Sequence, residues 1–142
     1  MNSDSKILIE YPEWVDIDES SIESRLTEVI NPGEFEIYQW DSQKTSNDLR
    51  GVEVREHIKE KGFLDKTFSY GNLKWFEYNQ DQIPKEWMEE KFIIYGYSSV
   101  VNDCYYFEHI PYLKCDSFRY AKVKWCYFYV NMGARSFAGM SK

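Results

Sequence analysis

The residues best suited to acid–base catalysis near neutral pH are the two histidines, His57 and His109. Cys104 lies five residues before His109, so this pair could supply a nucleophile and its base. Both belong to a segment with the pattern of a strand, where positions five apart point to opposite faces, and we expect no contact between them. Arg50 and His57, with six residues between them, fit a permissive ribonuclease motif, but the sequence pattern lacks the long helices on which that motif depends. We therefore expect no catalytic residues, a protein that is not an enzyme, and a partly buried structural role for His109.

The three cysteines, Cys104, Cys115 and Cys126, are spaced evenly by eleven residues in aromatic surroundings. This spacing is typical of repeated strands and turns and differs from the short Cys-x-x-Cys patterns of zinc and redox sites. The sequence also lacks the glycine motifs that bind phosphates or dinucleotides. We expect reduced, mostly buried thiols, no metal site and no cofactor.

Negative charge is concentrated in the first third of the chain. Between Lys6 and Lys44 there are ten acidic residues and one basic residue, for a local charge of −9 (one minus ten). From Lys114 onward there are six basic residues and one acidic residue, for +5 (six minus one). A surface of one sign speeds encounter with an oppositely charged partner, and tryptophan is common at the centre of interfaces. We predict partner-binding residues at Glu10, Glu13, Trp14, Asp16, Asp18, Glu19, Glu34, Glu36 and Asp41.

A second interpretation of the acidic stretch is structural. Asp16, Asp18 and Glu19 precede an expected helix, and carboxylates near a helix start interact favourably with its dipole. Asp16, Asp18 and Ser20 also match the opening of a calcium-binding loop, but serine and threonine occupy its sixth and twelfth positions, where glycine and glutamate are needed. Calcium binding is not expected.

Tyrosine is concentrated in the second half, where eight of the twelve tyrosines lie between residues 95 and 129. Neighbouring residues on a strand point to opposite faces, so these rings cannot all be buried; some form the rim of the core or a recognition surface. Lys122 and Lys124 share one strand face and alternate with aromatic residues, as in single-strand nucleic-acid platforms. With Arg119 they are the candidate phosphate-binding residues of an alternative function.

Composition limits the class of protein. The chain has 142 residues, enough for one domain of ordinary size, and 18% of them are aromatic. A net charge of −7 argues against nucleic acid as the main partner. No apolar run approaches the roughly 18 residues of a membrane span, and the first five residues lack the basic start of an export signal. We expect a cytoplasmic protein that does not bind membranes.

The pattern of hydrophobic residues and turn signals predicts a single α+β domain over residues 1–142. Its sheet is expected to be curved and mostly antiparallel, with about six or seven strands packed by two helices. The expected helices cover residues 20–30 and 46–61, with a helical turn at 84–90 and a helix end at Gly62. The expected strands cover residues 6–11, 34–40, 66–70, 73–78, 92–98, 101–110 and 119–130. Residues 71–72 are expected to form a hairpin turn, and residues 131–142 a flexible tail.

These features favour a protein that works by binding. The first hypothesis is an acidic, non-enzymatic inhibitor that docks on a basic, nucleic-acid-binding surface of its target. Examples are an immunity protein against a toxin, or an anti-defence protein of a phage or mobile element, such as an anti-CRISPR protein that blocks a nuclease. The chain contains 55 residues of types encoded by AT-rich codons and 19 of types encoded by GC-rich codons, a ratio typical of phages and low-GC bacteria. The alternatives are a small nucleotide- or RNA-binding enzyme or sensor that uses the C-terminal strands, and a homo-oligomeric subunit such as a homodimer.

Overall fold

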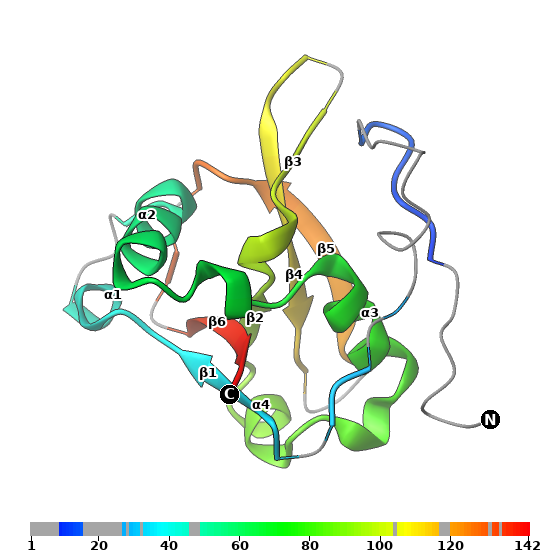
Figure 1. Cartoon of the computed structure of the whole chain (residues 1–142). Coiled ribbons are helices and arrows are strands. Elements are labelled where there is room, and N and C mark those ends of the chain that lie inside the picture. Colours follow the sequence, from blue (N-terminus) through cyan, green and yellow to red (C-terminus); the bar gives the residue numbers. More distant parts are fainter. Residues whose placement is uncertain are drawn as a thin grey trace.

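The computed structural model describes residues 9–15, 27, 29–31, 33–45, 49–103, 105–116, 120–130, 132–133 and 135–142. These residues form an α+β fold with an open, mixed, mostly antiparallel sheet of six strands and two main helices, which confirms the predicted fold class (Figure 1). The strands are β1 (Phe35–Tyr38), β2 (Ile93–Tyr95), β3 (Val101–Asn102), β4 (Glu108–Lys114), β5 (Lys122–Tyr127) and β6 (Ser136–Ser141). The helices are α1 (Asp41–Thr45), α2 (Gly51–Lys61), α3 (Tyr70–Tyr78) and α4 (Lys85–Glu89), with short 3-10 turns at Leu64–Lys66, Gln80–Gln82 and Tyr97–Ser99. No helix among the described residues has the length and hydrophobicity that crossing a membrane requires.

The strands follow the order β1, β6, β2, β4, β5, and β3 pairs with β4 beyond the end of β2. The β2–β6 pair is parallel and every other pair is antiparallel. β4 is the longest strand and pairs with β5 from His109↔Tyr127 to Lys114↔Lys122. Because alternate residues of a strand face opposite ways, this register fixes the face of every side chain on both strands.

Two hydrophobic clusters pack on the two faces of the sheet. On one face, Phe68, Phe76 and Trp87 of the α3–α4 region pack with Ile94 and Leu113. On the other face, α2 contributes Val54 and Ile58, which pack with a second set of strand and loop residues: Tyr95, Tyr97, Ile110, Phe128 and Met132. The alternation of Ile94 with Tyr95, and of Ile110 with Leu113, places the sheet between the two clusters.

The prediction of a flexible tail at residues 131–142 is wrong for the described part of that segment. Ser136–Ser141 forms β6, which lies between β1 and β2 (Figure 1, red). The small residues that suggested flexibility instead permit close packing, because a Cβ atom at Gly139 would overlap the buried ring of Phe68 and lie 2.8 Å from Cγ2 of Ile94. Tertiary packing therefore outweighs the local preference of this segment.

The predicted hairpin at residues 66–78 is also wrong, because Tyr70–Tyr78 forms helix α3. The signal for its start is a capping box: the Ser69 hydroxyl accepts a hydrogen bond from the Asn72 N–H at 3.2 Å, and Asn72 Oδ1 accepts one from the Ser69 N–H at 2.9 Å. Gly71 and Asn72 lie in the first helical turn and not in a two-residue hairpin loop. The helix buries Leu73 and Phe76 against the sheet, and this burial stabilises it.

Other predicted elements are confirmed in position and corrected in length. β1 and α4 lie within their predicted ranges, and α2 ends where Gly62 adopts a left-handed conformation, with φ of 85°. α2 begins at Gly51, later than predicted, and the strands expected at 92–98 and 119–130 are shorter, as β2 and β5. The strand expected at 101–110 is divided into β3 and β4, and β4 continues beyond the predicted end to Lys114. The described residues of the expected strand 6–11 and of the expected helix 20–30 have no regular structure, and the other residues of both elements lie outside the described part of the chain.

Replacing Gly139 by alanine should lower the free energy of unfolding by about 1–3 kcal/mol, the usual cost of overpacking a core. The reason is the overlap between the new methyl group and the ring of Phe68. Gly133→Ala is the matched control, since a Cβ atom there has no neighbour within 4 Å. Urea denaturation measures both changes, and equal stability of the two variants would contradict the placement of β6.

Candidate functional site

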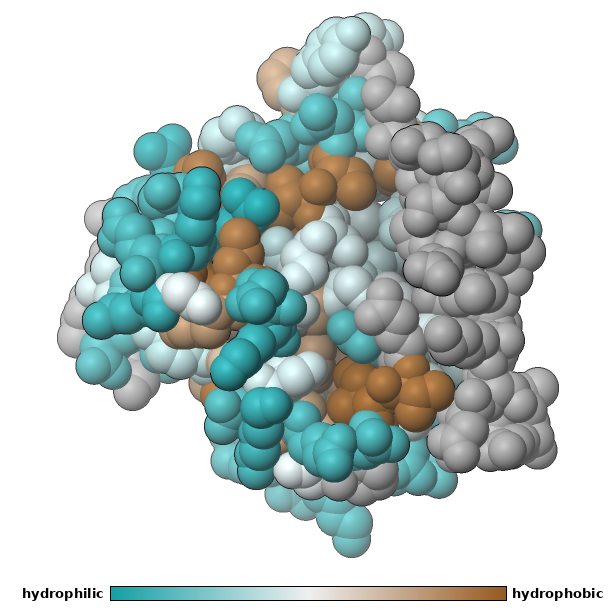
Figure 2. Space-filling model, viewed as in Figure 1, coloured by the Kyte–Doolittle hydropathy of each residue, from teal (hydrophilic) through white to brown (hydrophobic). Residues whose placement is uncertain are grey.

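The most exposed hydrophobic surface lies at the loop between β3 and β4. Tyr105, Tyr106 and Phe107 have relative exposures of 76%, 80% and 55%. The ring of Phe107 lies 6.4 Å from that of Tyr127, and Tyr129 lies beyond it, with exposures of 53% and 47% for these two tyrosines. We call these five residues the aromatic tip. Figure 1 shows the β3–β4 hairpin projecting from the body of the molecule, and Figure 2 shows its end coloured pale and brown instead of the teal of charged side chains.

The conformation of the loop depends on Asp103. Its Oδ1 atom accepts hydrogen bonds from the backbone N–H groups of Tyr105 at 2.8 Å and Phe107 at 3.0 Å. Its Oδ2 atom lies 3.0 Å from Nε2 of His109, and its backbone N–H donates to the carbonyl of Phe107 at 2.9 Å. Tyr106 has a positive φ of 66°, a conformation that non-glycine residues adopt only where the surroundings hold them in it. One carboxylate therefore organises the loop that presents three aromatic side chains.

The environment of Asp103 keeps its carboxylate ionised. Burial alone would raise the pKa of this group, but the hydrogen bonds with His109 and with the N–H groups of Phe107 and Tyr105 lower the pKa below its ordinary value. A carboxyl group whose pKa is lower in the folded than in the unfolded state adds stability above its unfolded pKa, about 3.9. That contribution is lost only as the pH falls through the lower folded pKa, so the loop keeps this support at neutral pH.

The N-terminal segment 9–15 packs beside the β3–β4 hairpin, near the base of the aromatic tip. Trp14 packs on His109 with ring centres 4.2 Å apart and meets Trp125 edge-on at 5.7 Å. The Tyr70 hydroxyl of α3 donates to the carbonyl of Glu10 at 2.8 Å, and Val15 forms a β-bridge with Asp103. Trp14 is thus half-buried against the chain's own residues and fixes this segment beside the hairpin.

The structure divides the predicted partner-binding acids into two groups. Glu10 and Glu13 are exposed on segment 9–15, whose last residue, Val15, pairs with Asp103 of the tip loop. Near the tip, Glu108 accepts a hydrogen bond from the Tyr129 hydroxyl at 3.1 Å. A second group is exposed on the opposite side of the molecule, on β1, its preceding turn and the start of α1 (Figure 1): Glu34, Glu36 and Asp41. Three further predicted residues lie outside the described part of the chain: Asp16, Asp18 and Glu19.

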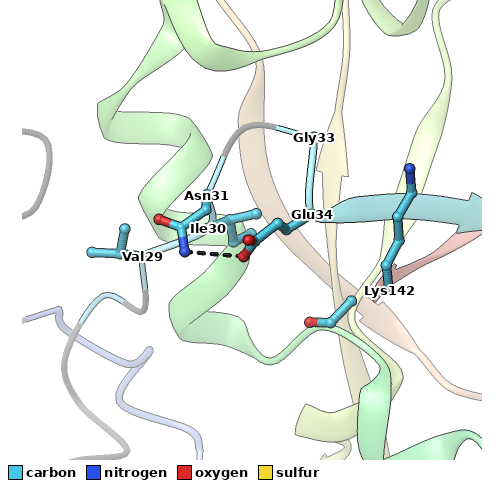
Figure 3. Close-up of a pocket in the computed structure, with 7 residues that line it drawn as sticks. Val29, Ile30, Asn31, Gly33, Glu34 and Lys142 are labelled. Carbon is cyan, nitrogen blue, oxygen red and sulfur yellow. Dashed lines mark hydrogen bonds between the residues drawn. The ribbon is translucent and has the colours of Figure 1, made fainter.

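A hollow of about 450 Å³ lies at the second acidic group, lined partly by Val29, Ile30, Gly33 and Glu34 (Figure 3). The Glu34 carboxylate accepts a hydrogen bond from the Asn31 side-chain amide at 3.1 Å, and Figure 3 shows the Lys142 amine directed away from it. Ser141 and Lys142 also border it, but among the described lining residues the Ser141 hydroxyl forms no hydrogen bond with a base, and the Glu34 carboxylate bonds only the Asn31 amide. This hollow therefore offers little for catalysis.

The candidate catalytic residues make structural contacts with neighbouring side chains. His109 is buried against Asp103, as the sequence predicts. The Tyr38 hydroxyl lies 2.6 Å from Nε2 of His57, which stacks on Trp40, while Arg50 pairs with Glu53 at 3.2 Å, so Arg50 and His57 do not converge. Burial, followed by the charge of Lys61, lowers the pKa of His57, and the histidine is neutral at pH 7.

The described cysteines are free thiols of low reactivity. Burial raises the pKa of Cys115 to about 12 and that of Cys126 to about 11, so neither is a thiolate at neutral pH. Cys104 lies outside the described residues. Within the described ranges, no three histidine, cysteine, aspartate or glutamate side chains are grouped as metal ligands would be.

The candidate phosphate-binding residues Lys122 and Lys124 are both exposed on β5, and Arg119 lies outside the described residues. They lie toward the start of β5, whereas Tyr127 of the aromatic tip ends it. The structure therefore contains two distinct candidate surfaces, joined by β4 and β5.

Sequence reasoning missed the aromatic tip as a site, although a signal for it was present. Tyr105, Tyr106 and Phe107 are consecutive, and no strand can bury three consecutive side chains on one face. The preceding Asn102 and Asp103 are residue types that favour turns, because their side chains accept hydrogen bonds from nearby backbone N–H groups. A turn signal followed by three aromatic residues thus indicates a loop that exposes them.

Comparison of the chain with protein-family models, with curated proteins and with solved structures found no match.

Replacing Asp103 by alanine should loosen the loop without unfolding the sheet. The N–H groups of Tyr105 and Phe107 lose their shared acceptor, and their hydrogen exchange should accelerate roughly tenfold or more. Asp65→Ala, at an exposed carboxylate on the 3-10 turn Leu64–Lys66, is the matched control. Unchanged exchange at Tyr105 and Phe107 in Asp103→Ala would show that the carboxylate does not organise the loop.

Proposed function

We propose that this protein is a non-enzymatic binding protein that docks its aromatic tip on a basic surface of another protein and inhibits it. A toxin-immunity protein and a phage or mobile-element anti-defence protein are the two forms this function would take. The observation that carries the proposal is the set of three consecutive aromatic side chains, 55–80% exposed, on a loop held by Asp103.

Exposed aromatic side chains in a fixed loop are suited to binding. Each ring offers a large contact area with two rotatable bonds, so little side-chain entropy is lost when a partner covers it. The backbone cost of ordering the loop is met within the free protein, because Asp103 already holds it. Tyrosine is also among the residue types that carry most of the binding energy in interfaces.

Charge favours a basic partner. Glu108 directly follows Phe107 and accepts a hydrogen bond from the Tyr129 hydroxyl of the tip, and Glu13 is exposed next to Trp14, whose ring packs on His109. Glu10 is exposed farther along the same segment, and the whole chain has a net charge of −7. Such a field accelerates encounter with a positive surface and disfavours acidic competitors. The nucleic-acid-binding face of a nuclease or toxin is a positive surface of this kind.

A second copy of this chain is a less favourable partner for the aromatic tip than a basic protein. Each of two copies would carry a net charge of −7, and the repulsion between them opposes a homodimer. A mass in light scattering of one chain, 17.1 kDa, is expected at working concentrations. A dimer that dissociates when the tip is altered would identify the tip as a self-association surface instead.

The double variant Tyr105→Ser/Tyr106→Ser should lose the partner while keeping the fold. Two solvent-exposed rings leave the tip, and each anchor is worth about 2 kcal/mol or roughly 30-fold in affinity. Tyr120→Ser is the matched control, because Tyr120 is 71% exposed and lies at the other end of β5. Each variant is used to capture proteins from the native host. The affinity of the captured protein for each variant, and its isoelectric point, are then measured.

The proposal requires a basic protein that the parent chain and Tyr120→Ser bind equally and that the double variant does not. Equal capture by the double variant would exclude the aromatic tip as the interface. An acidic partner would exclude the proposed charge complementarity.

A further inference from the structure

A second surface lies at the opposite end of β4 and β5 from the aromatic tip. A hollow of about 130 Å³ is lined by Lys114 of β4, by Lys122 and Lys124 of β5, and by Asp116 and Tyr120 from the connection between these strands. Among the described lining residues, three positive charges and one negative charge sum to +2 (three minus one), within a chain of net charge −7. We call this feature the lysine hollow.

The register of the sheet brings the three lysines together. Lys114 pairs directly with Lys122, and Lys124 follows two residues later on the same strand face. Like charges placed opposite each other on neighbouring strands destabilise a sheet. No ion pair to these lysines is found within the part of the chain that the structure describes. The fold thus keeps an unfavourable arrangement that a bound anion would turn into a favourable one.

We propose that the lysine hollow binds a phosphate group. Lysine ammonium groups are strong hydrogen-bond donors to phosphate oxygens, and three of them border this hollow. A water molecule occupies about 30 Å³ in the liquid, so the volume corresponds to about four waters. That space is large enough for one phosphate group.

The phosphate could belong to a nucleotide or to an inorganic polyphosphate, and a residue at the rim of the hollow separates these two sources. Tyr120 borders the hollow and is 71% exposed, so its ring is free to stack on the base of a nucleotide whose phosphate lies among the lysines. An inorganic polyphosphate would use the lysines alone. The phosphate chemistry is common to both, and the effect of Tyr120 separates them.

The test is a titration with inorganic diphosphate and, separately, with ATP without added metal, each at constant ionic strength. Thermal denaturation of the parent chain should shift upward by about 3 °C or more at saturation, because the ligand binds the folded state. Lys114→Gln/Lys122→Gln should lose this shift. Lys85→Gln is the matched control, since Lys85 is an exposed lysine on α4 and should leave the shift unchanged.

The double variant Lys114→Gln/Lys122→Gln also has a predicted melting temperature in the absence of ligand. Removing the opposed charges of Lys114 and Lys122 should leave the melting temperature unchanged or raise it by about 1 °C, so loss of the ligand response cannot be attributed to unfolding. A larger response to ATP than to diphosphate that Tyr120→Ser removes would identify a nucleotide, and equal responses that survive Tyr120→Ser would identify an inorganic polyphosphate. No shift in the parent chain, or an equal shift in Lys114→Gln/Lys122→Gln, would overturn the proposal.

Discussion

Both proposed surfaces depend on the register of β4 against β5. The pairing that sets His109 opposite Tyr127 at one end of β4 also sets Lys114 opposite Lys122 at the other. A slip of one residue would exchange the two faces of the strand, bury charges and expose the core. Pairing of β4 with β2 and β3 on its other side, and the packing of β6 beside β2, hold that register. The sheet is thus a rigid support whose two ends carry surfaces of different chemistry, one aromatic and one cationic.

The parts of the fold that sequence predicted are those fixed by local chemistry. Gly62 ends α2 because its left-handed conformation is easy only for glycine, and the helical turn expected at 84–90 forms as α4. The errors arose where distant contacts decide. Gly71 followed by Asn72 is a strong local hairpin signal, but the Ser69 cap and the burial of the following side chains produce a helix. Gly139 suggests flexibility until Phe68, far away in the sequence, is seen to pack against it.

The sequence indicated the residue types of the candidate site, acidic and aromatic, but not where the fold places them. Clustering of acids and excess tyrosine directed attention to charge and to aromatic rings, but composition does not place residues in space. The fold sets Glu10 and Glu13 on the segment whose end, Val15, pairs with Asp103, and places Glu36 and Asp41 on the other side of the molecule (Figure 1). Lys114 could not be assigned to the same surface as Lys122 without the pairing of β4 with β5. Long-range pairing is the information that periodicity along one strand lacks.

The central claim is that Asp103 holds the aromatic tip in one conformation in the free protein, ready for a partner. Backbone ¹⁵N relaxation of Tyr105, Tyr106 and Phe107 tests it directly and needs no knowledge of the partner. The hydrogen bonds of Asp103 predict order parameters of about 0.8 or higher, close to those of β4. Values below about 0.6 at these three residues would show a flexible loop and would contradict a preorganised docking site.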